Sequence, residues 1–333
     1  MNSRIEMAKR NLGDILREAI QLSAEEKTLV IFDTQSPLSC LLVEAYRLVV
    51  PMARFVDFDS VTPGDVFSLI DGLKAGDLVV LVQSTNFRLD EFRLRIELFK
   101  RSLKTVEHIH LGRMSEPQID IYLEALAYDP AYYRPLGRGL KRKLETAQEI
   151  VVEGKETRLV YGAGMEIVKL NIGDYSEMKN VGGTFPIGEV FTESKDLHAV
   201  NGDALIFAFA GEDHFVRTYE PFRVQIQDGI LTAPEAPTEF QTILEKIRED
   251  EEVLVREFGL GLNPAMYNKR IVNDITAFER QKGLHLSLGA KHAIYVKPGL
   301  SRKKGRYHVD VFVAADRISV DGVALYEQGE FIV

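Results

Sequence analysis

The sequence is poor in cysteine. Cys40 is the sole cysteine among 333 residues, so no disulfide can form within the chain. It stands in the apolar run CLLVEAY, where we expect a small buried side chain. Apolar runs long enough to span a bilayer are also missing. The segment MNSRIEMAKRNLGDILREAI has charges between its apolar positions, which is typical of an amphipathic helix and unlike a signal peptide. These absences predict a protein of the reducing cytoplasm.

Positive charge is in the minority as well. Lys and Arg number 41 against 50 Asp and Glu, which gives a net charge of −9. Such an acidic chain is not expected to have nucleic acid or an anionic membrane surface as its main partner. The phosphate-binding patterns GxGxxG and GxxxxGKT follow none of the expected strands, so a nucleotide site is not indicated. The composition, 45% apolar and 27% charged, is that of a globular enzyme, and the length suits two domains.

Short apolar strands alternate with helices in the first half of the chain. DLVVLVQ is apolar throughout, as strands buried on both faces of a parallel sheet are. Strand and helix segments of these lengths are typical of βαβ units, so we predict a doubly wound α/β domain over residues 1–150. The expected strands are TLVIFD, ARFVDFD, DLVVLVQ and TVEHIHL, and the expected helices include those that begin after Ser36 and Thr62, LDEFRLRIELFKRS, SEPQIDIYLEAL and GRGLKRKLETAQEI.

After about residue 149 the pattern changes to short strands separated by glycine or charged turns. One clear helix, PTEFQTILEKIRED, interrupts them. This pattern predicts an α+β domain rich in antiparallel strands over residues 151–333, with the boundary near Val151. The expected strands include EIVVEG, TRLVYGAG, MEIVKLNIG, ALIFAFAG, HFVRTYEPFRVQIQDGILTA, LHLSLG, AIYVKPG and YHVDVFV.

Five ionisable residues in the second half stand in apolar or glycine-rich sequence. Glu189 lies in FPIGEVFT, His285 in LHLSLG, and His308 and Asp310 in YHVDVFV; we expect Glu257, in VREFGLGLNP, at the end of a helix before a glycine-rich turn. Burying an unpaired charge costs on the order of several kcal/mol, so these residues need partners. Positions i and i+2 of a strand share one face, which brings His308 and Asp310 together.

Three arrangements satisfy this need. Divalent ions accept imidazole and carboxylate ligands, and the five side chains suffice for two ions a few ångströms apart. Each residue can instead have its own local hydrogen bond, which for any one of them taken alone is the commoner arrangement. His308 and Asp310 can also face solvent, although Phe312 on the same face argues against it. The residues alone leave these alternatives open.

The ordered set FPIGEVFT, EFGLGLNP, LHLSLG and YHVDVFV resembles the second domain of the thermophilic metallo-aminopeptidases of the aminopeptidase T and aminopeptidase S type. That family has N-P-x-G-E-V-F, E-x-G-I/L-G-x-N-P, H-I/L-A/S-L-G and a terminal H-x-D. The segment VNGDALIF and the length of the N-terminal domain are similar too. The specific motifs lie in the C-terminal half, and their common order is what makes the resemblance informative.

The resemblance implies metal ligands at Glu189, Glu257, His285, His308 and Asp310, with Glu189 and Glu257 as the catalytic carboxylates. It further implies a homodimer, a peptide substrate, and two divalent ions, zinc or cobalt, that activate a water for attack on the first peptide bond.

Two departures from the family pattern stand out. His292 occupies the place of a tyrosine seven residues after the first histidine, where it is either a further metal ligand or hydrogen-bond partner, or a surface histidine. The family's longer loop before H-x-D is replaced by the basic segment PGLSRKKGRYH, residues 298–308. Its Arg and Lys side chains form a solvated turn or bind a substrate carboxylate.

Two further readings of the resemblance remain. The related 2,5-dihydroxypyridine 5,6-dioxygenases hold one Fe(II) with two histidines and an aspartate, which His285, His308 and Asp310 would supply. That arrangement leaves Glu189 and Glu257 without a role. Alternatively, the chain is a degenerate member that keeps the fold as a binding module. Gly259 and Gly261 either let the backbone approach the site closely or form an ordinary helix C-terminal turn.

Overall fold

The computed structural model describes residues 3–89, 92–267, 269–290, 295 and 307–333. The chain divides into two compact units, each built from three segments. A single boundary near Val151 stays a prediction. The first unit comprises Met1–Arg134, Gly173–Ile187 and Asn268–Ala277, and the second comprises Pro135–Ile172, Gly188–Tyr267 and Phe278–Val333.

The first unit is an α/β domain, which confirms the predicted fold class. Within the described residues its main sheet has five strands, all parallel, in the order β10-β6-β3-β1-β2. The edge strand β10 comes from the second half of the sequence. The strands are β1 Thr28–Phe32, β2 Arg54–Asp57, β3 Leu78–Val82, β6 Lys104–His108 and β10 Gly182–Thr184, with the small pair β4 Arg88–Leu89 and β5 Phe92–Arg93; the helices are α1 Ser3–Asp14, α2 Pro37–Val49, α3 Pro63–Asp71, α4 Leu94–Lys100 and α5 Glu116–Ala125.

Local sequence explains where two of these helices begin. Ser36 caps α2 and accepts a hydrogen bond from the backbone N–H of Ser39, and Pro37 occupies the first turn. Thr62 caps α3 in the same way through Asp65. Cys40 corrects an expectation, because it lies on the exposed side of α2 and is not buried.

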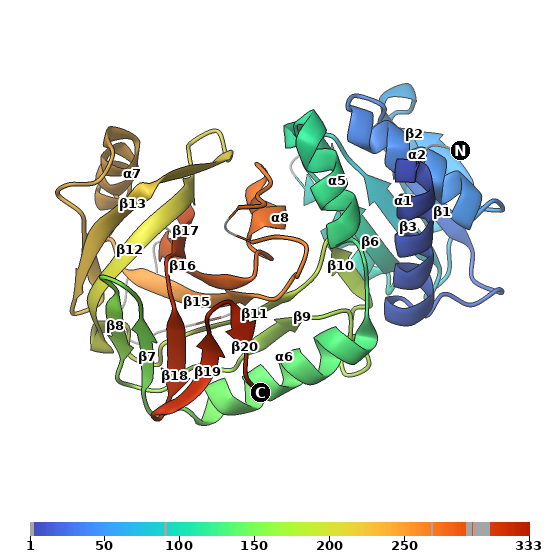
Figure 1. Cartoon of the computed structure of the whole chain (residues 1–333). Helices are drawn as coiled ribbons and strands as arrows, with labels where there is room; N and C mark the ends of the chain where they lie inside the picture. The colour runs from blue at the N-terminus through green and yellow to red at the C-terminus, as the bar shows by residue number, and fades with distance from the viewer. Residues whose placement is uncertain (1–2, 90–91, 268, 291–294, 296–306) are drawn as a thin grey trace. The chain divides into compact units, whose positions relative to one another are not determined.

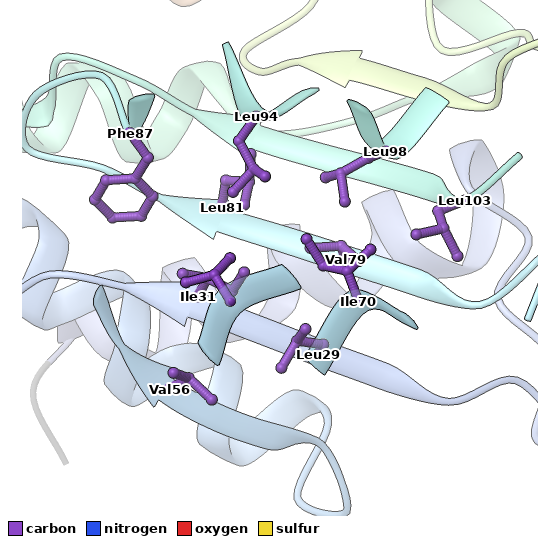
Figure 2. Packing of buried hydrophobic residues seen from close by; sticks show 11 residues of the cluster. Leu29, Ile31, Val56, Ile70, Val79, Leu81, Phe87, Leu94, Leu98 and Leu103 are labelled. Carbon is purple, nitrogen blue, oxygen red and sulfur yellow. The ribbon is translucent and has the colours of Figure 1, made fainter. Parts of the chain in front are cut away.

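Apolar side chains cover both faces of the parallel sheet because successive residues of a strand alternate faces. On one face, Leu29 and Ile31 of β1 and Val79 and Leu81 of β3 pack with residues of α3 and α4, as Figure 2 shows. The helices α1, α2 and α5 pack together in the same unit, and α2 contacts β3. No helix in the described ranges combines the length and hydropathy of a membrane crossing.

A buried histidine sits between two tyrosines in this unit. The Tyr46 hydroxyl lies 2.8 Å from Nε2 of His108, and the Tyr122 hydroxyl lies 3.0 Å from its Nδ1. Tyr122 donates its own proton to the carbonyl oxygen of Phe185, so it accepts from Nδ1–H, and Nε2 accepts from Tyr46. A neutral imidazole therefore satisfies every hydrogen bond, and burial lowers the pKa of His108 to about 3.

The lowered pKa of His108 predicts that the folded chain loses stability in acid. The unfolded chain binds a proton at His108 with a pKa of about 6.5, whereas the folded chain does so only near pH 3. Between these values the unfolded state holds more protons, so the free energy of unfolding falls as pH falls, by about 1.4 kcal/mol per pH unit. Urea unfolding of wild type and His108→Gln at pH 7 and pH 5 checks this. The wild type should lose about 2 kcal/mol more than the variant; equal losses would contradict the account.

The second unit is an antiparallel, strand-rich domain, also as predicted. Its thirteen strands, counted over the described residues, follow the order β20-β19-β18-β7-β8-β12-β17-β16-β15-β11-β9, with β13 paired to β12 and β14 to β13 (Figure 1). Its strands are β7 Ile150–Glu153, β8 Arg158–Tyr161, β9 Lys169–Asn171, β11 Glu189–Glu193, β12 Val200–Ala210, β13 Val216–Gln227, β14 Ile230–Thr232, β15 Val255–Gly261, β16 Gly283–Gly289, β17 His308–Val313, β18 Arg317–Val320, β19 Val323–Glu327 and β20 Glu330–Phe331, and its helix α7 spans Thr238–Arg248. Two helices, α6 Pro130–Thr146 and α8 Ile275–Phe278, include residues of both units.

One local prediction is wrong. Glu257 does not end a helix: it lies within β15, which is buried along its whole length and pairs with β11 on one side and β16 on the other. Helix α7 ends at Arg248, and Gly259 and Gly261 continue the strand. Two glycines and two charges make a poor strand by propensity, so tertiary pairing on both edges overrides the local preference.

Candidate metal site

Four neighbouring strands carry the ionisable residues to one face of the antiparallel sheet. The strands run in the order β17-β16-β15-β11, and Figure 1 shows three of them, β17, β16 and β15, side by side. Gly261 is paired with Glu189, Gly259 with His285, and His285 with Phe312. Because alternate residues of a strand share a face, Glu257 joins Gly259 and Gly261. By the same rule, His308 and Asp310 join Phe312.

Gly259 makes room for the imidazole. A Cβ built on Gly259 would overlap the ring of His285, which lies directly across from it. Phe312 flanks the ring on its other side, with ring centroids 5.7 Å apart, and in turn packs against Phe278. The imidazole of His285 is thus packed between the backbone at Gly259 and the ring of Phe312. Of the two readings of Gly259, the structure supports close backbone approach.

Glu189, Glu257 and His285 converge in a buried group. Nε2 of His285 lies 3.4 Å from Oε1 of Glu189 and 3.4 Å from Oε1 of Glu257. The three residues are 4%, 7% and 1% exposed. Among the residues that the structure describes, neither ring nitrogen of His285 has a hydrogen-bond partner. One ligand atom from each residue lies within 4.8 Å of the others, so the group can hold a metal ion.

These distances fit a shared ion better than a direct hydrogen bond. Two ligand atoms that each lie about 2.0–2.1 Å from a tetrahedral ion stand about 3.3 Å apart, close to the separations seen here. The two carboxylates also require a cation. Burial opposes protonation of His285, yet Glu189 and Glu257 outweigh it and raise the pKa of the imidazole to about 10. In the metal-free chain a proton therefore supplies the positive charge.

Arg280 and Glu279 also lie at the site, although no sequence pattern indicated them. Nη1 of Arg280 is 3.3 Å from Oε2 of Glu189, and the same guanidinium forms an ion pair with Glu279. Burial opposes ionisation of Glu189, but Arg280 and His285 prevail and lower its pKa. Both residues stand in AFERQKGL, a polar stretch that is typical of a solvated turn. Such a stretch predicts exposed side chains, so these two were not predicted as site residues.

His308 and Asp310 form a second pair on the same face. Nε2 of His308 lies 3.2 Å from Oδ1 of Asp310, and its Nδ1 lies 3.1 Å from the carbonyl oxygen of Ala290. Burial opposes ionisation of Asp310, yet His308 and a hydrogen bond from Glu279 lower its pKa. Burial raises the pKa of Glu279 well above its ordinary range. The side chain of His308 is 37% exposed, in contrast to the buried triad.

The structure does not describe the remaining residues that the sequence analysis singled out. His292, expected as a further metal ligand or a surface residue, lies outside the described residues, as do residues 298–306 of the basic segment.

Comparison with known proteins places the fold. AmpT, aminopeptidase T from Thermus thermophilus, has a similar structure, with a TM-score of 0.61 over 98% of this chain and 99% of that one. The chain has the aminopeptidase T fold. At 14% sequence identity this similarity concerns architecture and not activity. No family model matches the sequence, and no curated protein matches it.

The candidate metal-ligand side chains differ in their exposure to solvent. The triad of Glu189, Glu257 and His285 is buried, and the pair of His308 and Asp310 stands at its more exposed side. Carboxylate and imidazole donors suit zinc, cobalt and related divalent ions. Such a site can activate a water and polarise a carbonyl group.

Proposed function

We propose that the protein is a metal-dependent aminopeptidase that hydrolyses the first peptide bond of a peptide. The observation that carries the proposal is the triad, in which a buried imidazole without a hydrogen-bond partner among the described residues faces two buried carboxylates. The aminopeptidase T fold supports the same reading. Neither observation depends on the other, since one concerns atoms at a site and the other the path of the whole chain.

Each residue has a definite task in this proposal. Glu189, Glu257 and His285 hold a divalent ion, which when bound supplies an acidified water and a Lewis acid for the carbonyl oxygen. Glu257 accepts a proton from the attacking water, because Glu189 is already engaged through one oxygen by Arg280. His308 and Asp310, at the more exposed side, complete the donor set and hold a second ion in the two-metal scheme, or else orient the peptide amine.

The dioxygenase alternative has weaker support. It needs His285, His308 and Asp310 around one Fe(II). In the structure the donors gathered around His285 are instead the two glutamates, with Nε2 of the imidazole aimed between them. A one-iron site of the facial type would leave these two buried carboxylates unexplained.

Removal of metal gives the direct test. Protein dialysed against a chelator should lose hydrolysis of an aminoacyl-p-nitroanilide, and added Zn²⁺ or Co²⁺ should restore it, because the water must be acidified to act near neutral pH. The measurement is release of p-nitroaniline from a peptide analogue with a free amine, with an N-acetylated analogue as the control substrate. Oxygen uptake on a hydroxylated pyridine with bound iron would favour the dioxygenase. Absence of stoichiometric metal would favour a binding module.

A further inference from the structure

Arg280 is a buried cation inside the candidate site. Arg280 is 6% exposed, and its guanidinium contacts the carboxylate of Glu189 and the carboxyl group of Glu279. Arginine keeps its charge in proteins, so this positive charge is permanent. Buried cations are tolerated when paired, and here both partners belong to the site itself.

The contacts divide the two oxygens of Glu189. Oε2 faces Nη1 of Arg280 at 3.3 Å, whereas Oε1 faces Nε2 of His285 at 3.4 Å. One oxygen is therefore committed to the chain's own cation and the other points into the triad. The carboxylate thus presents Oε1 to a metal ion, and the positive charge beside Oε2 opposes binding of a second ion there.

Charge leads to the same conclusion. Around the site the described residues include three carboxylates, those of Glu189, Glu257 and Asp310, beside the carboxyl group of Glu279. Arg280 neutralises part of this charge at Glu189, and a second divalent ion there would lie beside a fixed positive charge in a poorly hydrated environment, where repulsion is strong. Asp310 meanwhile has its own partner in His308.

We propose that Arg280 takes the place of a second metal ion, so that this site binds one divalent ion tightly, through Oε1 of Glu189 together with Glu257 and His285. The inference rests on the proposed function only in taking the triad as a metal site. It makes Arg280 a positioning residue that orients Glu189 and sets the metal stoichiometry.

Metal stoichiometry of the full chain provides the test. Metal-free protein is titrated with Co²⁺, followed by calorimetry and by the visible absorption of the bound ion. Wild type should take up one tight equivalent, with any second equivalent at least ~100-fold weaker. Arg280→Met removes the fixed charge and should bind two equivalents of similar affinity. Arg280→Lys keeps the charge and should bind one.

Arg256→Met is the matched control. Arg256 is also a buried arginine of this unit, 4% exposed and paired with Glu251 at 2.9 Å, and its Nε donates to the carbonyl oxygen of Gly289. It should bind one equivalent, which separates loss of a buried arginine from loss of this arginine. Circular dichroism identifies variants that fail to fold, and wild type and Arg280→Lys then carry the test.

Two tight equivalents in wild type would overturn the inference, as would a folded Arg280→Met that still binds one. These failures are distinct from failure of the proposed function. One tight equivalent without peptide hydrolysis would leave the role of Arg280 standing and remove the aminopeptidase. Peptide hydrolysis by a wild type that binds two tight equivalents would support the aminopeptidase and contradict the role of Arg280.

Discussion

Replacing Glu257 by glutamine is expected to lower kcat for an aminoacyl-p-nitroanilide by about 10³-fold while leaving the fold intact. The change keeps the size of the side chain and removes the charge that accepts a proton from water, a contribution of about 10²–10⁴-fold in enzymes. It also removes a ligand, so metal affinity should fall. Assays at saturating Co²⁺ separate the two effects, because excess metal restores occupancy and not the base.

Glu245→Gln serves as the control for this prediction. Glu245 is an exposed glutamate of α7 in the same unit, so its substitution removes the same charge without touching the site. Its kcat should match that of wild type. Unchanged turnover in folded, metal-loaded Glu257→Gln would remove Glu257 from the mechanism.

Replacing Gly259 by alanine is expected to weaken metal binding by about 10–100-fold, although a methyl group carries no chemistry of its own. The added Cβ would overlap the imidazole of His285, which is enclosed on its other side by Phe312. The ring must therefore rotate or the strand must shift, and displaced ligand geometry costs affinity of this order. Overpacking should also lower the free energy of unfolding by about 1–3 kcal/mol. Co²⁺ titration and urea unfolding measure the two effects.

Gly162→Ala provides the comparison. Gly162 lies in the same unit, and a Cβ there meets its nearest neighbour, the carbonyl oxygen of Ala199, at an ordinary contact distance of 3.6 Å. Metal affinity should be unchanged in this variant. Wild-type affinity in Gly259→Ala would mean that His285 can move without consequence, and would contradict its assignment as a ligand.

Both domain types could be predicted from the sequence because local patterns encode them. The parallel strands are short apolar runs, and capping residues such as Ser36 and Thr62 mark where helices begin. The edge strand β10 could not be predicted, since its three residues are Gly182, Gly183 and Thr184. They form a strand because β6 offers a free edge, and not because of any preference of their own.

The sequence by itself determined which residues are costly to bury: Glu189, Glu257, His285 and Asp310 stand among apolar or glycine neighbours, and each needed a partner. It also placed His308 beside Asp310, since a strand repeats every two residues. Only the tertiary structure decided the partners. Strand register across β11, β15 and β16 joins residues nearly a hundred positions apart, and register depends on pairing that no local pattern contains. Arg280 shows the same limit, because its polar sequence neighbours indicate solvent, whereas folding buries its charge against the side chains of Glu189 and Glu279.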